Sequence, residues 1–278
     1  MRKLILFTML FVSLISMAQV KRNSLGQKMV DKVLVYSGEK DTPYLIINFE
    51  YDNDRKLIGV VEKSEYQTNI WKKVGNTMKR TKYLDGEIDS NYKFEHTLNR
   101  DGLISEMTMY NGTGGEYLVY KYQFFYTDGK LDLVRENHYI DYPNGKRVEL
   151  SDRYKRDYLL ENGNVYFSPH KIAWRWKEEE EPYREVKKNN MSYYEDKIND
   201  TNIDFLQLFD GIKGTYGFEL ATEWINLRSK NLIQKNGNSI FDYLWEDYGE
   251  DTNIIEFHEY DNWNKKLRTR FEFFYLLE

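Results

Sequence analysis

Apolar and polar residues alternate over several stretches of the chain, which is the pattern of β-strands with one buried face. The clearest apolar faces consist of Leu45, Ile47, Phe49 and Tyr51; of Leu118, Tyr120, Tyr122, Phe124 and Tyr126; of Ile172, Trp174 and Trp176; and of Phe271, Phe273, Tyr275 and Leu277. The opposite faces carry more polar residues. Strands that are apolar on one face and wetter on the other predict antiparallel pairing.

A recurring turn separates these strands. An aromatic or apolar residue is followed by Asp, Asn or Gly, then by a polar residue and an aliphatic one, at 51–57, 98–103, 126–131, 142–148, 160–165 and 260–267. Asp-Gly and Asn-Gly supply the positive φ that tight hairpin turns need. The turns therefore predict a meander of hairpins.

One stretch departs from the period of two. From 201 to 234 the apolar spacing is helical, with Ile203, Leu206 and Phe209 on one side, and strands are expected to resume near Ile240. The predicted fold is mainly all-β, an antiparallel β-meander that forms a curved or partly closed barrel-like sheet. A short helical insert near 201–232 would plug or cap one end of this sheet.

The hairpins and the insert together resemble a family of Bacteroidetes exported domains of unknown function with a porin-like fold. The similar segments are Tyr51–Leu57, Leu98–Leu103, Thr201–Leu208 and the closing hairpin at Tyr260–Asn262. YD-repeat-like hairpin proteins are similar to a lesser degree. The resemblance implies a curved, partly closed sheet in an exported soluble protein, and it implies no activity.

The first 18 residues have the features of a secretory signal peptide. Arg2 and Lys3 form a positive start, the apolar run at 4–15 is shorter than the roughly 18 residues of a spanning helix, and Ser16-Met17-Ala18 is a small-residue cleavage site. We expect cleavage after Ala18, no membrane-spanning segment afterwards, and a single antiparallel β domain at 19–278. The expected location is the periplasm or the extracellular space.

Composition narrows the possible partners. The chain has no cysteine, which excludes disulfides and the lipidated cysteine of a lipoprotein. The formal net charge is −5, and removal of residues 1–18 takes away two positive charges. Without a basic block, nucleic acid is not an expected partner. A lipid-embedded barrel is disfavoured because the outer faces carry many charged residues and the chain ends in Glu278.

No catalytic or cofactor motif is present. His96, His138, His170 and His258 lack the spacing of a zinc site, and no Gly-x-Ser-x-Gly occurs. The Asp and Asn residues at 52–54 suit a hairpin turn better than a calcium loop, which would need a glycine and a late glutamate. We therefore expect no metal and no cofactor.

Trp174-Arg175-Trp176 is the candidate ligand-binding site. Two indoles on one strand face, roughly 7 Å apart, would stack sugar rings or peptide aromatics. The alternative is that both pack in the core beside Ile172. The acidic run at 178–181 is expected to be a solvated loop.

Three functions remain open. The first is a non-enzymatic envelope protein that binds a glycan, a lipid or another protein on a concave β surface. The second is a carboxylate-dependent hydrolase of an envelope or dietary polymer, which requires two acidic side chains in one cleft. The third is a structural or assembly accessory with an exposed sheet edge.

Overall fold

The computed structural model describes residues 19–75, 77–111, 117–127, 130–141, 147–150, 155–170, 191–205, 229–248 and 251–277. Strands account for most of these ranges: β1 (Val30–Ser37), β2 (Leu45–Tyr51), β3 (Leu57–Ser64), β4 (Gln67–Val74), β5 (Thr77–Leu84), β6 (Glu87–Leu98), β7 (Ile104–Asn111), β8 (Tyr117–Thr127), β9 (Lys130–Asp141), β10 (Arg147–Leu150), β11 (Lys155–Glu161), β12 (Asn164–His170), β13 (Ser192–Ile198), β14 (Asn231–Asn236), β15 (Ser239–Tyr248), β16 (Asp251–Asp261) and β17 (Leu267–Tyr275). Within them, no helix has the length and apolar character needed to cross a membrane.

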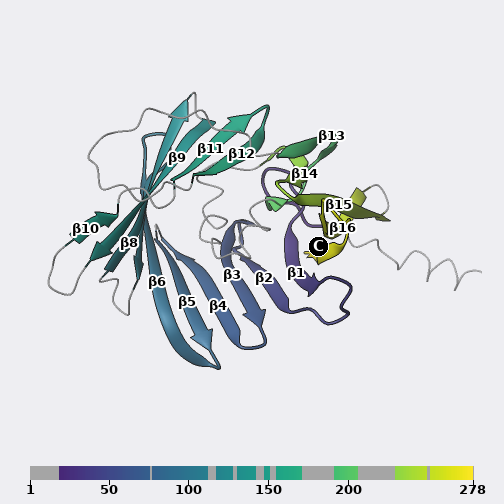
Figure 1. The fold of residues 1–278 in the computed structure, drawn as a ribbon, viewed down its shortest axis with the longest axis horizontal. Helices are drawn as coiled ribbons and strands as arrows, with labels where there is room; N and C mark the ends of the chain where they lie inside the picture. Colours follow the sequence, from purple (N-terminus) through teal and green to yellow (C-terminus); the bar gives the residue numbers. More distant parts are fainter. Residues whose placement is uncertain are drawn as a thin grey trace, which may run out of the picture.

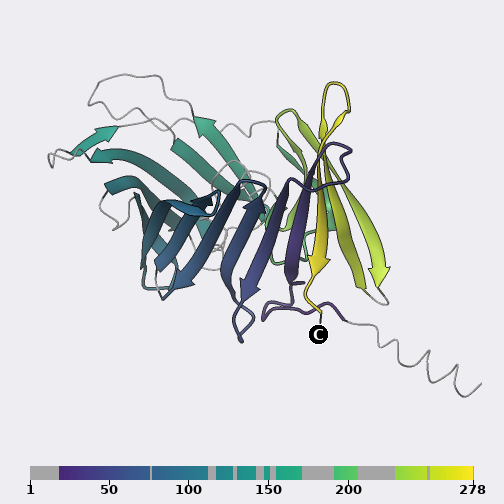
Figure 2. The same cartoon turned by 90° about the horizontal axis from the view of Figure 1, so that it is seen from below.

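Fifteen strands form one curved antiparallel sheet, which is not closed into a barrel. Its order is β10-β9-β8-β7-β6-β5-β4-β3-β2-β1-β17-β16-β15-β14-β13. The first and last strands pair in the middle, with Val33 opposite Phe273 and Val35 opposite Phe271 (Figure 2). The all-β class, the antiparallel pairing and the curvature expected from the alternation are confirmed.

The β11–β12 hairpin lies between the two ends of this sheet (Figure 1). On one side, β11 contacts β9. On the other side, the Lys230 amide donates to the Gly163 carbonyl at 2.7 Å, and the Asn231 amide donates to Asn164 Oδ1 at 2.8 Å. The hairpin therefore bridges the opening that the sheet leaves.

Aromatic side chains fill the interior on the side of β15, β16 and β17. Phe257 packs within 5.1 Å of Phe241, Tyr243 and Phe271, measured between ring centroids. Phe205, which enters from the segment after β13, meets Phe257 edge-on at 5.6 Å. Large rings from non-adjacent elements thus share one core.

The start of the expected insert packs inside the sheet, where Ile203 and Phe205 are buried. Residues 206–228 of the insert lie outside the described residues. The expectation that strands resume near Ile240 is wrong, because β14 already begins at Asn231. The signal for this strand is the Asn-Gly turn at 236–237, in which Gly237 has a φ of 59° and connects β14 to β15.

The recurring turns are organised by their first Asp or Asn. Asp52 Oδ1 accepts a hydrogen bond from the Lys56 amide at 2.9 Å, and Asp261 Oδ1 accepts one from the Trp263 amide at 2.8 Å. These bonds confirm the turn interpretation of both aspartates. Glycine is not always the residue with positive φ, because Arg55 and Lys265 take that conformation in turns without Gly.

Four tyrosine side chains bond back to the strand that precedes their own in the chain. In each case the phenol donates to a backbone carbonyl: Tyr51 to Val30 at 2.5 Å, Tyr126 to Ile104 at 2.8 Å, Tyr243 to Ile233 at 2.9 Å and Tyr275 to Ile254 at 2.9 Å. A buried phenol needs such a partner. The tyrosines thus join neighbouring strands through their side chains as well as through the backbone.

Candidate functional site

The site nominated from the sequence, Trp174, Arg175 and Trp176, lies outside the described residues, as does the acidic run at 178–181. Among the described residues, the candidate functional groups lie on the buried face of the sheet. Two regions of this face differ, and we call them the apolar half (β15, β16, β17, β1 and β2) and the mixed half (β3 to β8).

One row of paired residues crosses both halves and changes character at β3. Its members face each other from strand to strand in the order Phe273, Val33, Ile47, Glu62, Asn69, Lys82 and Ser90. The first three are apolar and the last four are polar or charged. Paired residues lie on the same face of a sheet. The polar members therefore continue the surface that forms the core in the apolar half.

Glu62 is the centre of a polar network on this row. Its Oε2 accepts a hydrogen bond from Asn69 Nδ2, and its Oε1 accepts one from Trp71 Nε1, both at 2.9 Å. Asn69 Oδ1 in turn accepts a hydrogen bond from Arg80 Nη2 at 3.1 Å, and the Arg80 guanidinium lies 5.0 Å from the centroid of the Trp71 ring. The network joins β3, β4 and β5.

Burial raises the pKa of Glu62 to about 7. The hydrogen bonds from Asn69 and Trp71 and the positive charge of Arg80 act in the opposite direction and only partly offset the burial. Near neutral pH this carboxyl group is therefore divided between its protonated and ionised forms. Groups with such shifts are concentrated at functional sites.

His96 lies on β6 in the same half and is buried. Burial, and then the positive charge of Lys73, lower the pKa of His96 to about 4. The imidazole is therefore neutral at physiological pH, so it adds no charge to the interior.

His258 belongs to a different network on the outer face of β16. Its Nε2 lies 2.5 Å from Glu256 Oε2, and its Nδ1 lies 3.1 Å from the Tyr260 hydroxyl. Arg270 on β17 contacts Glu256 and covers the Tyr36 ring at 4.1 Å. These side chains hold one another across three neighbouring strands, which suits a structural role.

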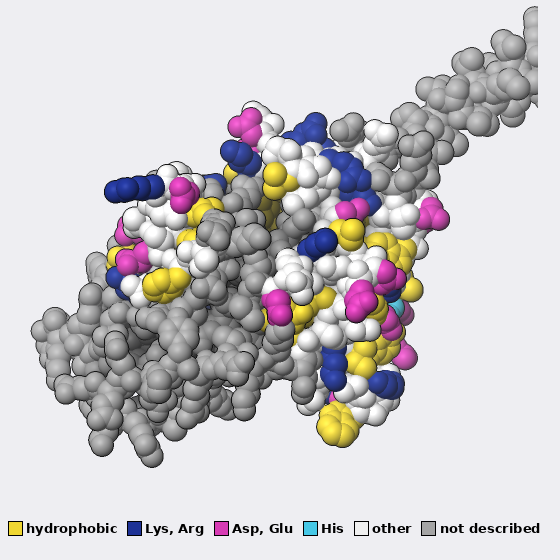
Figure 3. All heavy atoms as spheres, turned by 90° about the horizontal axis from the view of Figure 1, so that it is seen from above, with side chains coloured by type: hydrophobic (Ala, Val, Ile, Leu, Met, Phe, Trp, Pro, Cys, Tyr) yellow, Lys and Arg dark blue, Asp and Glu magenta, His cyan; other side chains and the backbone are white. Residues whose placement is uncertain are grey.

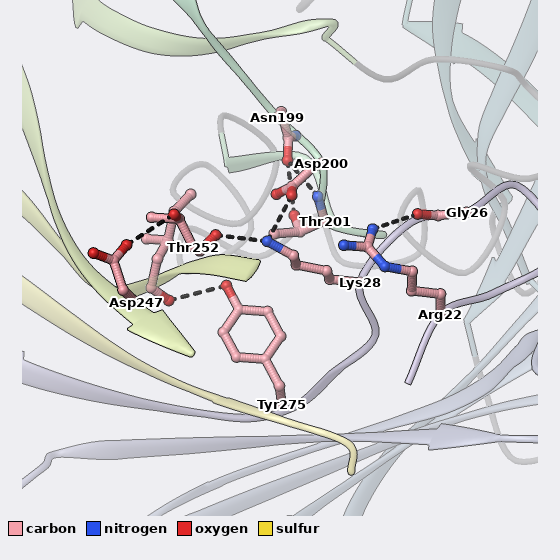
Figure 4. Close-up of polar contacts among 10 residues, drawn as sticks. Arg22, Gly26, Lys28, Asn199, Asp200, Thr201, Asp247, Thr252 and Tyr275 are labelled. Atoms are coloured by element: carbon pink, nitrogen blue, oxygen red, sulfur yellow. Dashed lines mark hydrogen bonds and ion pairs between the residues drawn. The ribbon is translucent and has the colours of Figure 1, made fainter. Parts of the chain in front are cut away.

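Lys28 is buried and forms an ionic contact where three segments meet (Figure 4). Its Nζ lies 2.7 Å from Asp200 Oδ2 and donates to the Thr252 carbonyl at 2.6 Å. Thr252 Oγ1 donates to Asp247 at 2.9 Å. Lys28 thereby fixes the segment that carries Ile203 against β16. We interpret this cluster as an anchor for the insert.

The hydrolase hypothesis requires two facing carboxylates. Glu62 and Glu259 are both buried, but four strand-to-strand steps separate β3 from β16 in the sheet. Glu259 is held by the hydroxyls of Ser239 at 2.6 Å and Thr269 at 2.8 Å. These two carboxylates therefore do not form a catalytic pair.

Two further observations concern ions and charge. Among the described residues, no group of three or more His, Asp or Glu side chains is arranged to hold a metal ion. On the described part of the face in Figure 3, acidic and basic side chains are mixed with apolar ones. The described part of that face therefore has no single sign of charge to steer a partner.

The sequence analysis missed Glu62, Asn69 and Arg80. Period-two alternation places Glu62 on the face of Val60 and places Asn69 on the face of Trp71, so a polar position on an inward face was visible. These three residues meet only because of the register in which β3, β4 and β5 pair. Register depends on how β3 connects to β4 and β4 to β5, and the residues between these strands contain no Asn-Gly or Asp-Gly.

The sequence matches no family model and no curated protein. The fold is similar to that of a solved porin-like protein from Bacteroides uniformis ATCC 8492, with a TM-score of 0.51, 12% identity, and coverage of 90% of this chain and 96% of that chain. A solved porin-like protein from Bacteroides vulgatus ATCC 8482 is 15% identical over 89% of this chain and 98% of that chain, with a TM-score of 0.39. The likeness to the Bacteroides uniformis protein confirms the expected porin-like fold and extends to the fold alone.

Proposed function

We propose that the chain is an exported envelope protein that binds its ligand on the concave face of the mixed half. In this proposal residues 1–18 are a signal peptide, and residues 19–278 act as one domain without catalysing a reaction. The similarity to a porin-like protein of Bacteroides supports the envelope location.

The observation that carries the proposal is the change from apolar to polar at β3. Burying a carboxyl group is costly unless its partners compensate fully, and the raised pKa of Glu62 means that they do not. The apolar half fills most of the same face with Phe and Val, and the carboxylate that it does bury, Glu259, is held by the hydroxyls of Ser239 and Thr269. A protein that retains polar groups where apolar ones would pack is consistent with selection for binding.

A glycan suits this face better than an acyl chain. Glycan sites combine flat aromatic or aliphatic surfaces with a few placed polar groups. The same face also presents Ser64, Gln67 and Ser90, all partly exposed, on β3, β4 and β6. Their hydroxyl and amide groups match sugar hydroxyls as donors and acceptors.

The test is a binding screen with two matched variants. Residues 19–278 would be titrated with a glycan panel and with lipid vesicles, followed by intrinsic tryptophan fluorescence. Ser90→Trp places a large side chain on the concave face, whereas Asn91→Trp places it on the outer face of the same strand.

We expect Ser90→Trp to weaken glycan binding by about tenfold or more and Asn91→Trp to leave it unchanged. The opposite ranking would show that the ligand binds elsewhere. The double variant Trp174→Ala/Trp176→Ala tests the site nominated from the sequence in the same assay. A loss of binding in that variant alone would move the site to 174–176.

A further inference from the structure

Trp263 lies in the turn between β16 and β17, and its side chain is 82% exposed. It is the most exposed large apolar side chain among the described residues. A tryptophan carries a large apolar surface and is mostly buried in the average folded chain. In Figure 2 the β16–β17 hairpin projects beyond the strands beside it, at the end of the sheet away from the C-terminus. The indole is therefore presented to the surroundings of the protein.

Hydrogen bonds within the turn hold the backbone under this indole. Asp261 Oδ1 accepts bonds from the Trp263 amide at 2.8 Å and from the Asn264 amide at 3.3 Å. The other carboxylate oxygen of Asp261 pairs with the Arg268 guanidinium, and the Asp261 carbonyl accepts a bond from the Lys265 amide at 2.9 Å. A turn that is already ordered loses little conformational freedom when its side chains make a new contact.

The same turn is positively charged. Residues 262–266 include two lysines and no acidic residue, in a chain with a formal net charge of −5. Lys265 Nζ donates to the neutral Asn262 Oδ1 at 3.2 Å, and Lys266 is exposed. Neither ammonium group has an acidic partner in the part of the chain that the structure describes. The turn therefore offers an exposed indole and two uncompensated positive charges together.

A groove of about 510 Å³ lies beside the turn, between the end of β1 and the start of β17. It is lined by Ser37, Gly38, Glu39, Lys266, Leu267 and Arg268. The groove leaves room for a phosphate group beside Lys266. Glu39 is the acidic member of the lining, and its charge acts against an anionic ligand.

We propose that this turn contacts the surface of a bilayer that contains anionic phospholipid, with Trp263 at the level of the headgroups and a lipid phosphate beside Lys266. Tryptophan favours the membrane–water interface, and anionic lipids attract lysines that lie close to it. Lysine is depleted in protein–protein interfaces, so an indole beside two lysines favours a bilayer over a protein partner. The inference goes beyond the proposed glycan site and uses none of the residues named for that site.

The experiment measures sedimentation of residues 19–278 with vesicles of phosphatidylcholine, with and without phosphatidylglycerol. Residues 1–18 are left out because their apolar run would itself bind vesicles. We expect binding to be about tenfold tighter with phosphatidylglycerol and to weaken as salt is added. Lys265→Gln/Lys266→Gln removes this difference. Lys56→Gln/Lys79→Gln, which neutralises two exposed lysines outside the turn, is the matched control and leaves it unchanged.

Trp263 and Glu39 have their own readouts. An indole that enters the headgroup region shifts its fluorescence emission to shorter wavelength, and Trp263→Phe should remove this shift while it retains part of the binding. Trp263→Ala should weaken binding about tenfold, whereas Leu25→Ala, at a side chain that is 75% exposed, leaves it unchanged. Glu39→Gln should tighten binding to the anionic vesicles about fivefold.

The outcomes separate this inference from the proposed function. Equal weakening by the two double lysine variants, or an emission shift that persists in Trp263→Phe, would overturn the assignment to this turn. Binding to neither kind of vesicle also overturns it and leaves the glycan site in place. Ser90→Trp leaves vesicle binding unchanged, and a loss of vesicle binding in that variant would place the lipid on the concave face and overturn the inference. Urea denaturation checks that each variant is folded.

Discussion

The apolar half and the mixed half share strand geometry but differ in what they bury. In the apolar half, Phe257 packs against four other rings, and the buried side chains are mostly Phe, Val and Ile, with Glu259 as a polar exception. In the mixed half, the same inward positions hold Glu62, Asn69 and Arg80 beside Trp71 and Met78. The comparison shows that the apolar half of the sheet can stabilise the fold, while the mixed half carries buried polar groups that reduce its stability.

The largest effect is expected from the apolar half. Phe257→Ala removes a fully buried ring from the centre of the aromatic cluster, and we expect a loss of about 4 kcal/mol of unfolding free energy. Urea denaturation followed by fluorescence measures it. The control Phe274→Ala, at a ring that is 36% exposed, costs less than about 1 kcal/mol. Similar losses for both would mean that this cluster is not the main core.

In the mixed half, the raised pKa of Glu62 should make the stability of the fold depend on pH. The folded pKa of Glu62, about 7, lies above its ordinary value of 4.5, so the folded state holds a proton that the unfolded chain has lost. Its contribution to stability is complete below about pH 4.5 and is lost as the pH rises through about 7. Between about pH 5 and pH 8 this amounts to about 2 kcal/mol.

The side chain in Glu62→Gln cannot ionise. Between about pH 5 and pH 8 the unfolding free energy of this variant should therefore fall by about 2 kcal/mol less than that of the wild type. Urea denaturation of both proteins at several pH values provides the comparison. A wild-type stability that rises with pH in this window, or an unchanged slope in the variant, would contradict the assignment of a protonated Glu62.

The smallest effect is expected from the hydrogen bonds that tyrosine phenols donate to backbone carbonyls, which occur in both halves. Tyr275→Phe and Tyr126→Phe each leave a backbone carbonyl without its phenol donor, at a cost of about 1 kcal/mol. Tyr275 contributes to the apolar half, where burial raises its pKa strongly, so we expect the larger loss there. Thermal unfolding detects the difference. Tyr66→Phe, at a side chain that is 64% exposed, should be indistinguishable from the wild type.

The sequence predicted most of the strands but not the Glu62 network. The alternation at 45–51 and 271–275 gave the inward faces correctly, since Ile47, Phe49, Phe271 and Phe273 are all buried. It missed β14 because the apolar pair Leu232-Ile233 fits a helix as well as a strand. It missed the Glu62 network because no motif links residues on three strands.

The sequence by itself determined the all-β class, the antiparallel hairpins and the residues that face inward, because these follow from a period of two and from turn chemistry between near neighbours. The tertiary structure alone decided that β1 pairs with β17, that the β11–β12 hairpin bridges the ends of the sheet, and that Glu62 meets Asn69, Trp71 and Arg80. These contacts depend on strand register and on sheet curvature. Both are set by the packing of the whole interior and not by any local run of residues.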